Sequence, residues 1–300
     1  MNLRDLTYFE IIATTSHIGR AAEQIGRTQP ALTKCVQRLE DELGAKLFVK
    51  DGRGIKLTPV GEVLLERARA LRETADNYAR DVMDFAIGNA GRIRVGTGAT
   101  TAEYLLPAIC DVLWRERPGL KIEVHVGLND VLRTMLANNQ LDVAMGPLLG
   151  SDESNFAIME LGTDEVVVAA RPNHPLFSSP LCLKSMLNYG WVLPASSVAL
   201  RQWIDAAFDD AGLSRPKIQI ETNVLSLLFS LISHTDLLIF ASRHNLTRRA
   251  GSDKLCELQL PETTMKRRLG IVYQRSGYIS PATKTFLDTA ISVAKKILAS

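Results

Sequence analysis

Long apolar runs are the first thing that this 300-residue sequence lacks. The best stretch, residues 224–232, is too short to span a bilayer, so we expect no membrane partner. Residues 1–10 alternate charged and apolar side chains and contain no apolar core of the signal-peptide kind. These two absences favour a cytoplasmic protein.

Cysteines and paired histidines are also scarce. The four cysteines are Cys35, Cys110, Cys182 and Cys256, and they lie far apart in the sequence. The five histidines include no pair with metal-ligand spacing. Zinc pairs and a dense disulfide framework are therefore excluded, and reduced thiols are the favoured interpretation. We expect no metal and no cofactor.

Charge of one sign is missing too, because 35 Lys and Arg face 33 Asp and Glu. A net charge of +2 excludes a uniformly basic protein that coats nucleic acid. The 46% hydrophobic content is that of a globular protein, and the length suggests more than one domain. The charge is nevertheless uneven, because the segment from Arg27 to Lys56 carries a net +3.

Residues 1–57 predict a winged helix-turn-helix. Asn2 is a plausible N-cap of a first helix, and residues 18–25 form a second short helix. Thr28 is placed to cap a third helix that contains Pro30 in its first turn and stops at Gly44. Two helices joined by a short turn are typical of DNA-binding heads, and the following Asp51-Gly52 pair closes a hairpin.

The third helix and the hairpin carry the residues that we expect to contact DNA. The amino end of the third helix suits phosphate, and the polar side of that helix can reach base edges in a major groove. The hairpin tip can enter a minor groove. The predicted set is Arg27, Thr28, Gln29, Pro30, Thr33, Lys34, Arg38, Lys50 and Arg53. The alternative for each charge taken singly is a solvated face, and the combination with turn and hairpin favours DNA binding.

Residues 58–90 predict one long linker helix, with Thr58 as its cap and Pro59 in its first turn. Apolar residues recur at alternating spacings of four and three, which is typical of a coiled-coil seam. They are Leu64, Ala68, Leu71, Ala75, Tyr78, Val82 and Phe85. The small alanines favour a close antiparallel pair of helices and hence a dimer. The alternative is an amphipathic helix that packs on its own domain.

Residues 91–300 predict an α/β domain with two lobes. Strands and helices alternate twice in the order that gives parallel sheets, which places lobe 1 at about 91–163 and 268–300 and lobe 2 at about 164–267. Residues 165–170 and 268–274 are expected to cross between the lobes. A cleft between two such lobes is a binding site for a small molecule.

Ligands of such folds bind beyond the carboxyl ends of the strands. The residues predicted there are Thr100, Thr101, Asn129, Gly146, Pro147 and Leu148 in lobe 1, and Ser196, Ser197, Val198, Arg201, Thr222 and Asn223 in lobe 2. Hydroxyl and N–H groups suit an anionic or polyhydroxylated molecule, and Arg201 is placed either to clamp a carboxylate or to face water. The alternative for each Ser, Thr and Asn is ordinary helix capping.

A set of motifs in the first region resembles the LysR-type transcriptional regulators. The motifs are AAEQI at 21–25, TQPALT at 28–33, LEDELG at 39–44, LF at 47–48, LTP at 57–59, and Gly61. The resemblance implies a DNA-reading third helix, a dimerising linker helix and a type 2 periplasmic-binding-protein-like effector domain. It also implies a homo-oligomer, dimer or homotetramer, that binds promoter DNA and a small effector, with RNA polymerase as a further partner.

Three positions depart from the usual family pattern. Lys50 stands where an arginine usually follows the Leu-Phe-x motif. Thr33 stands where serine is common, and Cys35 occupies a helix position where the side chain is usually bulkier or polar. Lys50 would hold a phosphate as a point charge and not as a bidentate fork. These departures leave the predicted fold unchanged.

Other functions fit the sequence less well. An enzyme on a two-lobed α/β fold would need a nucleotide loop or a nucleophile elbow, and neither motif is present. A transport protein of the solute-binding kind would carry a signal peptide. A redox-sensing regulator, as the resemblance implies it, needs two effector-domain cysteines close in sequence, whereas Cys182 and Cys256 are far apart.

Overall fold

The computed structural model describes every residue except 53, 88–90, 248–253, 276–278 and 299–300. For residues 73, 77, 80, 81 and 84–87, inside a long helix, only the backbone is described. The chain divides into two compact units, the first made mainly of Met1–Ile87 and the second of residues 88–137 and 141–300. Among the described residues, no helix has both the length and the apolar character that crossing a membrane requires.

The first unit begins with helices α1 (Leu3–Thr15), α2 (Ile18–Gln24) and α3 (Gln29–Leu43). The Asn2 side chain accepts a hydrogen bond from the Asp5 N–H at 2.9 Å, so the predicted cap of α1 is confirmed. Gly44 ends α3 with a φ of +62°, a conformation that favours glycine. Thr28 stands at the N-cap of α3, but its side chain makes no capping hydrogen bond, so that part of the prediction is wrong.

The predicted hairpin follows α3. Strands β1 (Phe48–Asp51) and β2 (Gly54–Leu57) pair antiparallel, with Phe48 opposite Leu57 and Asp51 opposite Gly54. Gly52 adopts a φ of +56°, as a tight turn of this length requires. The three helices and this hairpin form the winged helix-turn-helix.

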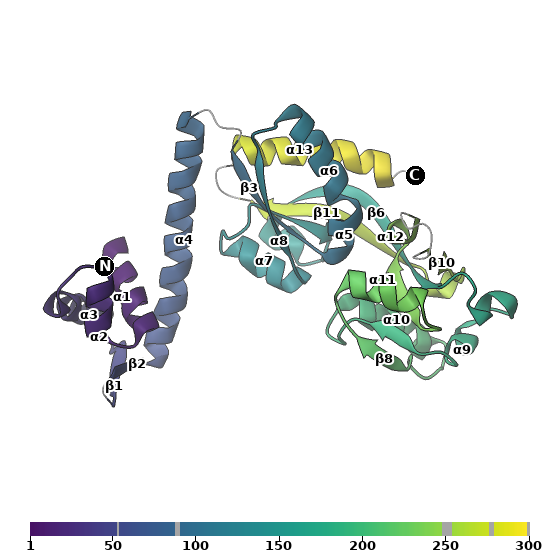
Figure 1. Cartoon of the computed structure of the whole chain (residues 1–300), viewed down its shortest axis with the longest axis horizontal. Helices are drawn as coiled ribbons and strands as arrows, with labels where there is room; N and C mark the ends of the chain where they lie inside the picture. The colour runs from purple at the N-terminus through teal and green to yellow at the C-terminus, as the bar shows by residue number, and fades with distance from the viewer. Residues whose placement is uncertain (53, 88–90, 248–253, 276–278, 299–300) are drawn as a thin grey trace. The chain divides into compact units, whose positions relative to one another are not determined.

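The long helix α4 (Pro59–Ile87) lies beside α1 (Figure 1) and shares its core with the winged helix. The Thr58 hydroxyl accepts a hydrogen bond from the Gly61 N–H at 3.0 Å and caps α4, as predicted. Leu64 and Leu65 pack against the cluster formed by Phe9, Cys35, Leu39 and Leu47. The predicted boundary between residues 57 and 58 therefore runs through a continuous hydrophobic core.

The second unit is built on a mixed sheet with the strand order β4-β3-β5-β11-β6-β9-β7-β8, and a short β10 pairs with β6. The strands are β3 (Arg92–Thr97), β4 (Lys121–Val126), β5 (Val143–Pro147), β6 (Phe156–Ala170), β7 (Trp191–Leu193), β8 (Ile218–Glu221), β9 (Leu238–Ser242), β10 (Cys256–Glu257) and β11 (Met265–Gln274). β3 runs parallel to β4 and β5, and β7 runs parallel to β8 and β9. Both lobes therefore have the predicted parallel arrangement.

Strands β6 and β11 join the lobes. They pair antiparallel from Met265 opposite Val166 to Gln274 opposite Phe156, so the pairing extends further than the predicted crossings. β11 also pairs with β5 of lobe 1, and β6 also pairs with β9 of lobe 2. Each of these two strands therefore belongs to both lobes.

Helices cover both faces of lobe 1. They are α5 (Ala99–Tyr104), α6 (Leu106–Glu116), α7 (Asn129–Ala137), α8 (Asp152–Asn155) and α13 (Pro281–Leu298). α6 and α13 pack together on one face, and the α7 residue Leu132 packs with Ala144 on the other. The sequence predicts one helix from about Thr101 to Glu116, and this is wrong. α5 ends at Tyr104 and a new helix begins at Leu106 with Pro107 in its first turn.

Lobe 2 has the same layers. Its helices are α9 (Leu183–Met186), α10 (Ala199–Asp210), α11 (Leu225–Ser233) and α12 (Arg243–Thr247), with short 3-10 turns at Pro175–Ser178 and Pro261–Thr263. Phe208 of α10 packs with Trp191 on one face of the sheet. Phe229 of α11 packs with Val192 on the opposite face. Alternate residues of one strand point to opposite faces, which is why Trp191 and Val192 belong to different clusters.

Candidate nucleic-acid interface and small-molecule cavity

The amino end of α3 is open to solvent. Residues 27–31 are all exposed, the first turn contains no acidic side chain, and no side chain caps it. Pro30 has no N–H, and the Ala31 N–H donates to the Thr28 carbonyl at 3.0 Å. The Gln29 N–H and the positive end of the helix dipole are therefore what suit a phosphate. Arg27, Thr28, Gln29 and Pro30, which the sequence predicts as contacts, all lie there.

The remaining predicted contacts occupy different environments. Lys34 and Lys50 are exposed, on α3 and on the hairpin. Thr33 is half-buried, and its hydroxyl donates a hydrogen bond to the Gln29 carbonyl at 3.0 Å. Arg53 lies outside the described residues.

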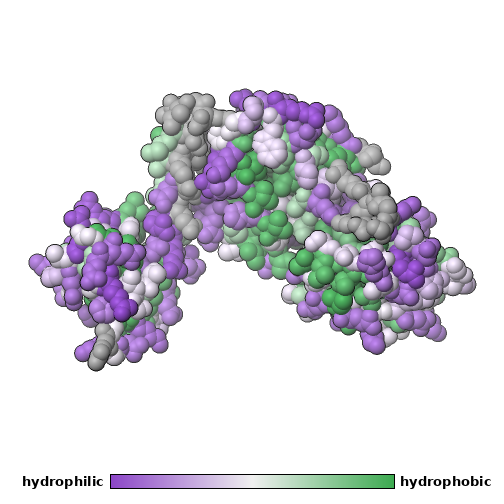
Figure 2. Space-filling model, in the orientation of Figure 1, coloured by the Kyte–Doolittle hydropathy of each residue, from purple (hydrophilic) through white to green (hydrophobic). Residues whose placement is uncertain are grey.

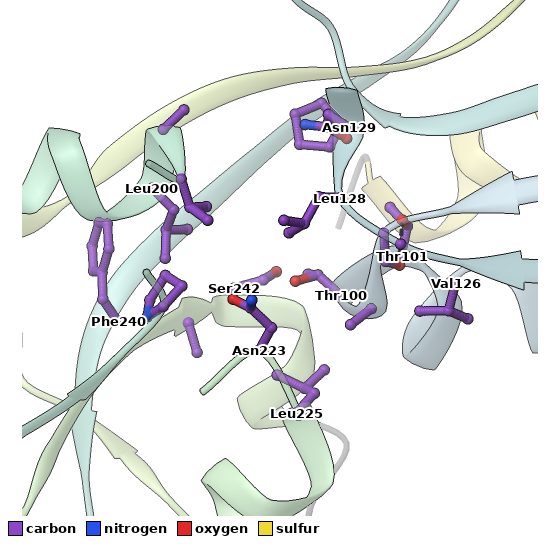
Figure 3. Close-up of a pocket in the computed structure, with 18 of the residues that line it drawn as sticks. Thr100, Thr101, Val126, Leu128, Asn129, Leu200, Asn223, Leu225, Phe240 and Ser242 are labelled. Atoms are coloured by element: carbon purple, nitrogen blue, oxygen red, sulfur yellow. Dashed lines mark hydrogen bonds between the residues drawn. The ribbon is translucent and has the colours of Figure 1, made fainter. Parts of the chain in front are cut away.

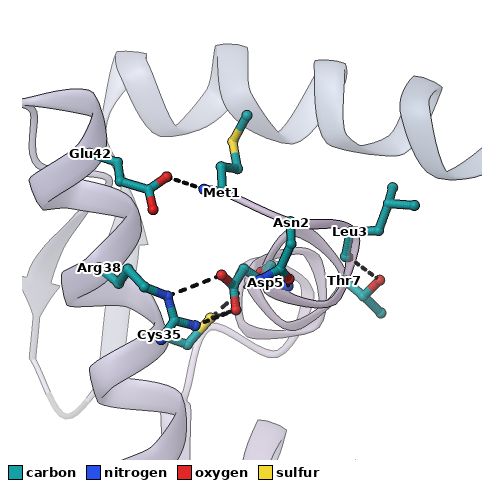
Figure 4. A network of polar contacts seen from close by, with 8 residues as sticks. All are labelled: Met1, Asn2, Leu3, Asp5, Thr7, Cys35, Arg38 and Glu42. Atoms are coloured by element: carbon teal, nitrogen blue, oxygen red, sulfur yellow. Dashed lines mark hydrogen bonds and ion pairs between the residues drawn. The ribbon is translucent and has the colours of Figure 1, made fainter.

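Arg38 differs from the others because it is bound within the unit. Its Nε donates a hydrogen bond to Asp5 Oδ2 at 3.1 Å, and its Nη2 pairs with Asp5 Oδ1 (Figure 4). The Asp5 side chain is only 4% exposed and joins α1 to α3. The geometry therefore favours a positioning role for Arg38 over the predicted contact with bases.

Asp5 is a residue that the sequence prediction missed. Burial alone would raise its pKa, but hydrogen bonds from Arg38 and Cys35, with the charge of Arg38, outweigh burial and lower it. A signal was present, because Asp5 stands four residues before Phe9 on the buried side of α1. A carboxylate at such a position needs a buried partner.

The Cys35 thiol lies in the same network. Its Sγ lies 3.5 Å from Asp5 Oδ1 and 3.7 Å from the Asp5 carbonyl. Burial first, and the Asp5 charge second, raise the pKa of Cys35 to about 12. Cys35 is therefore an inert thiol at neutral pH. All four cysteines are free, and Cys182 is the exposed one.

A second buried carboxylate fixes the hairpin. Glu40 accepts a hydrogen bond from the Leu47 N–H at 2.9 Å and pairs with Lys46 at 2.6 Å. Burial would raise the Glu40 pKa, but the Lys46 ammonium and the backbone N–H groups lower it. Because Glu40 faces inward, its negative charge is largely withdrawn from the surface that carries Lys34 and Lys50.

The apolar stripe of α4 divides into two parts. Ala68 is buried and Leu64 half-buried within the unit itself, as the alternative interpretation expected. Leu71, Tyr78 and Val82 are 47%, 57% and 68% exposed. Other exposed apolar residues of the helix are Val60, Val63 and Met83. Ala75 is half-buried, and the side chain of Phe85 is outside the described part of the helix.

A cavity of about 480 Å³ lies between the lobes of the second unit. Its walls come from the ends of the parallel strands, the helices that follow them and the crossing strands. The lining residues are Gly98, Ala99, Thr100, Thr101, Val126, Gly127, Leu128, Asn129, Asp130, Pro147, Leu149, Pro194, Ser197, Val198, Ala199, Leu200, Thr222, Asn223, Leu225, Leu228, Phe240, Ala241, Ser242 and Arg267. Its volume is within the range of small-molecule sites.

The structure brings most of the predicted ligand residues to this cavity. From lobe 1 these are Thr100, Thr101, Asn129 and Pro147, and from lobe 2 they are Ser197, Val198, Thr222 and Asn223. The Thr101 hydroxyl is hydrogen-bonded within the protein, because it lies 2.8 Å from the hydroxyl of Thr97. Thr222 accepts the Val224 N–H at 3.1 Å, which is a local turn bond just before α11 and not a cap of its first-turn N–H groups.

Four predicted residues do not line the cavity. Gly146 pairs with Gly270 inside the sheet, because β5 extends to Pro147, whereas the sequence predicts that this strand ends at Met145. Leu148 packs into a core cluster of lobe 1, and the neighbouring Leu149 lines the cavity in its place. Ser196 lies outside the lining.

Arg201 is the fourth of these residues. Its Nε lies 2.9 Å from both carboxylate oxygens of Asp205, one turn further along α10. Its Nη1 donates to the Pro194 carbonyl at 3.4 Å. Arg201 is therefore engaged within lobe 2, and neither of its predicted alternatives, a carboxylate clamp or a water-facing side chain, matches its position.

The cavity walls are more apolar than the sequence prediction suggested. Leu128, Leu200, Leu225 and Phe240 surround the polar ends of the lining residues (Figure 3). Figure 2 shows hydrophobic residues gathered over both lobes around the hollow. The apolar members come from separate strand ends and helices, so no local pattern groups them.

An ion pair forms part of the cavity wall. Arg267 of β11 lines the cavity and lies opposite Asp164 of β6 in the strand register. Its Nε donates to Asp164 Oδ2 at 2.8 Å, and its Nη2 lies 2.7 Å from the same oxygen. The Ser242 hydroxyl donates to Asp164 Oδ1 at 2.6 Å. Sequence reasoning missed all three residues.

Comparison with known proteins agrees with both units. Residues 86–295 match the family model described as LysR substrate binding domain. Residues 3–62 match the model described as bacterial regulatory helix-turn-helix protein, lysR family. The transcriptional regulator GalR of Pseudomonas putida is 30% identical over 282 residues, which are 93% of this chain and 70% of that protein.

Two further likenesses extend the comparison. The regulator GbpR of Azospirillum brasilense is 28% identical over 239 residues, covering 79% of this chain and 70% of that protein. The fold matches that of CbnR solved with its target DNA, with a TM-score of 0.73 at 18% identity over 98% of this chain and all of that one. With both domain models matched along nearly its whole length, the chain belongs to the LysR family of bacterial transcriptional regulators.

Proposed function

We propose that this LysR-type regulator reads a pseudo-palindromic promoter site with the amino end of α3 and the hairpin, under control of a small molecule in the cavity. The observation that carries the proposal is the amino end of α3, which is exposed, uncapped and free of acidic side chains. Gln29 is suited to base edges, while Lys34 and Lys50 are suited to phosphates. Arg53 stays a prediction for the minor groove.

Selection of bound sequences from random DNA tests the proposed reading role. Gln29→Ala should change the preferred base at one position of each half-site, because a side chain that contacts a base edge is lost. Lys34→Ala should weaken all sequences alike and reduce the salt slope by about 1, because a phosphate contact is lost. Lys217→Ala, an exposed lysine of lobe 2, is the matched control. Unchanged binding by both head variants would refute this interface.

We propose further that α4 pairs two copies through its exposed apolar residues. Leu71, Tyr78 and Val82 leave a hydrophobic stripe that a second copy would cover. Leu71→Glu should give monomers that bind half-sites weakly, as measured by sedimentation. Leu43→Glu is the control, because Leu43 is similarly exposed in the same unit but stands on α3. A homotetramer needs additional contacts and stays a prediction, as does contact with RNA polymerase.

We propose that the effector acts by binding to both lobes at once. Residues of the two lobes share one cavity, so a ligand there has a different affinity for different lobe arrangements. The expected result is a DNA footprint that changes in length when ligand is added. A ligand that binds the cavity and leaves the footprint unchanged would contradict this control step.

We infer that the cavity binds its ligand without transforming it. The ionisable side chains of its lining are Asp130 and Arg267, and the described lining offers no histidine or cysteine as base or nucleophile. The expected result is that a bound ligand is recovered unchanged after long incubation. We also place the protein in the cytoplasm, where promoter DNA is found and where the four free thiols stay reduced.

A further inference from the structure

The charged side chains of the cavity point to one chemical class of ligand, given the proposed role of the cavity as the effector site. Among the described lining residues, Arg267 is the cation and Asp130 is the anion. Asp130 is exposed in the first turn of α7, whereas the Arg267 side chain is only 12% exposed. An anionic ligand group would therefore be held most strongly beside Arg267.

Arg267 is held rigidly for such a role. Asp164 is fully buried and receives Arg267 on one oxygen and the Ser242 hydroxyl on the other. The hydrogen bond from Nε to Asp164 fixes the position of the guanidinium group. The buried Nη2 of Arg267 lies 2.7 Å from Asp164 Oδ2 but makes no hydrogen bond within the described part of the chain, so this donor is still available. A donor that is already fixed in position loses little conformational entropy when it binds an anion.

Hydrogen-bond donors from other elements lie in the same cavity. Helices α10 and α11 begin there, and neither N-cap residue, Val198 or Val224, caps them with its side chain. The side chains of Thr100, Ser197 and Asn223 line the cavity and have no partner of their own within the described part of the chain. In Figure 3 the polar ends of Thr100 and Asn223 lie close to that of Ser242.

The rest of the lining selects the body of the ligand. Leu128 and Leu149 come from lobe 1, and Leu200, Leu225 and Phe240 come from lobe 2. A polyhydroxylated sugar would leave many hydroxyl groups unpaired against such walls, which is costly. A dicarboxylate or a phosphate ester would bring a second negative charge to a cavity whose one cation, among the described lining residues, is already paired with Asp164.

We propose that the effector is an apolar monocarboxylate, with its carboxylate beside Arg267 and its body between Leu128, Leu200 and Phe240. The hydroxyl of Thr100 and the amide of Asn223 supply further donors to the carboxylate. Asp164 neutralises Arg267 when the cavity is empty, so the unliganded protein does not carry a buried isolated charge.

Calorimetry on the full chain tests the class with matched pairs of probes. Benzoate, phenylacetate and 4-methylpentanoate are each compared with their neutral amides, at concentrations up to about 10 mM. At least one acid should bind, and its amide should bind about 10- to 100-fold more weakly, because the charged hydrogen bond is lost. Glucose and phthalate should not bind. The class is overturned if no acid binds or if each amide binds as well as its acid.

Variants then test the assigned contact. Arg267→Gln should weaken the acid about 10- to 100-fold and leave the amide unchanged. Arg201→Gln is the matched control, since Arg201 is also 12% exposed and paired with an aspartate but does not line the cavity. Arg267→Gln by itself leaves the Asp164 carboxylate buried without its partner. The double variant Arg267→Gln with Asp164→Asn removes both charges and so tests the loss of the arginine without that buried carboxylate. Equal loss in both arginine variants, or none in either, would refute the assignment.

Two readouts separate this inference from the proposed function. Acid binding that depends on Arg267 but leaves the DNA footprint unchanged supports the ligand class and contradicts the control step. A footprint change produced by glucose, and abolished by the cavity-filling change Leu200→Trp, supports the control step and overturns the monocarboxylate.

Discussion

Removing the carboxylate of Asp152 should destabilise the second unit strongly. Arg133 of α7 donates from Nε to Asp152 Oδ1 at 2.9 Å and from Nη2 to Oδ2 at 2.8 Å. The two side chains are 10% and 1% exposed. Asp152 also accepts the Leu149 N–H at 2.9 Å, and Arg133 donates to the Pro147 carbonyl at 3.2 Å. The pair thus holds the loop that lines the cavity with Pro147 and Leu149.

The size of the expected loss of stability follows from the burial of both Arg133 and Asp152. Asp152→Ala leaves the Arg133 guanidinium buried without a counter-charge, which costs about 3–5 kcal/mol. A domain of this size loses about 2–4 °C of melting temperature for each kcal/mol, so the expected drop is about 6 to 20 °C. Differential scanning calorimetry of the full chain measures this drop in melting temperature. The transition of the second unit is identified as the one whose melting temperature rises when a ligand binds the cavity.

A double variant is the control for Asp152→Ala. Arg133→Met combined with Asp152→Leu removes both charges at similar volume, and we expect it to melt within a few degrees of the native protein. The reasoning is refuted if the single variant melts within about 2 °C of the native protein. It is equally refuted if the double variant falls as far as the single one.

The same pair gives the second unit an acid-sensitive stability. Burial would raise the pKa of Asp152, but the hydrogen bonds from Arg133 and the Leu149 N–H, and the Arg133 charge, lower it below 3.8. A carboxyl with a lowered folded pKa stabilises the protein above its unfolded pKa and loses that contribution as the pH falls through the folded value. The native protein should therefore lose stability below about pH 4 more steeply than the uncharged double variant.

Three further predictions use the pKa shifts and the buried carboxylate of the first unit. Cys182, which is exposed and has a pKa lowered by hydrogen bonds from the Ser185 backbone and side chain, should react with iodoacetamide well before the buried Cys35; equal rates in peptide mapping would contradict this. Burial lowers the pKa of His174 below 6.5, so its stabilising effect is full above about pH 6.5 and is lost as the pH falls; His174→Gln should flatten the melting temperature between pH 7 and 5. Glu40→Ala should destabilise the winged helix by about 1–3 kcal/mol in urea unfolding, because it leaves the buried Leu47 N–H unpaired, whereas Glu42→Ala, at an exposed position, should change it little.

Much of the fold could be predicted because its signals are local. Asn2, Gly44 and Pro59 mark helix ends through their own chemistry, and the structure places α1, α3 and α4 accordingly. The full length of β6 and β11 could not be predicted, because it depends on pairing between segments about a hundred residues apart. The break at Pro107 was a local signal that the prediction overlooked.

Part of the cavity lining could also be predicted from local signals in the sequence. Residues just after a strand, such as Thr100 and Asn223, follow from the rule that ligands bind at the carboxyl ends of parallel strands. Arg267 and Phe240 reach the cavity through strands that cross or end at the junction of the lobes, which no local pattern encodes. Arg201 could have been assigned correctly, because Asp205 stands four residues later on the same helix.

The position of the Asp164–Arg267 pair gives the cavity a means of acting on both lobes. The two residues face each other on β6 and β11, the strands that both lobes share. On another side of the junction, α5 and α12 are tied by the stacked rings of Tyr104 and His244, 5.1 Å apart, and by Asn245, which donates to Glu103 at 2.6 Å.

A ligand as small as a carboxylate gains little from closure of the lobes beyond the contacts with Thr100 and Asn223, because its main partner, Arg267, lies on the shared strands. A body long enough to reach Leu128 in lobe 1 and Leu200 in lobe 2 gains contacts only when the lobes are close, and that difference in affinity is what shifts a conformational equilibrium. Acetate should therefore compete weakly with the apolar acids for the cavity but leave the DNA footprint as it is without ligand. If saturating acetate changes the footprint as the longer acids do, control comes from the charge at Arg267 alone and not from closure of the lobes.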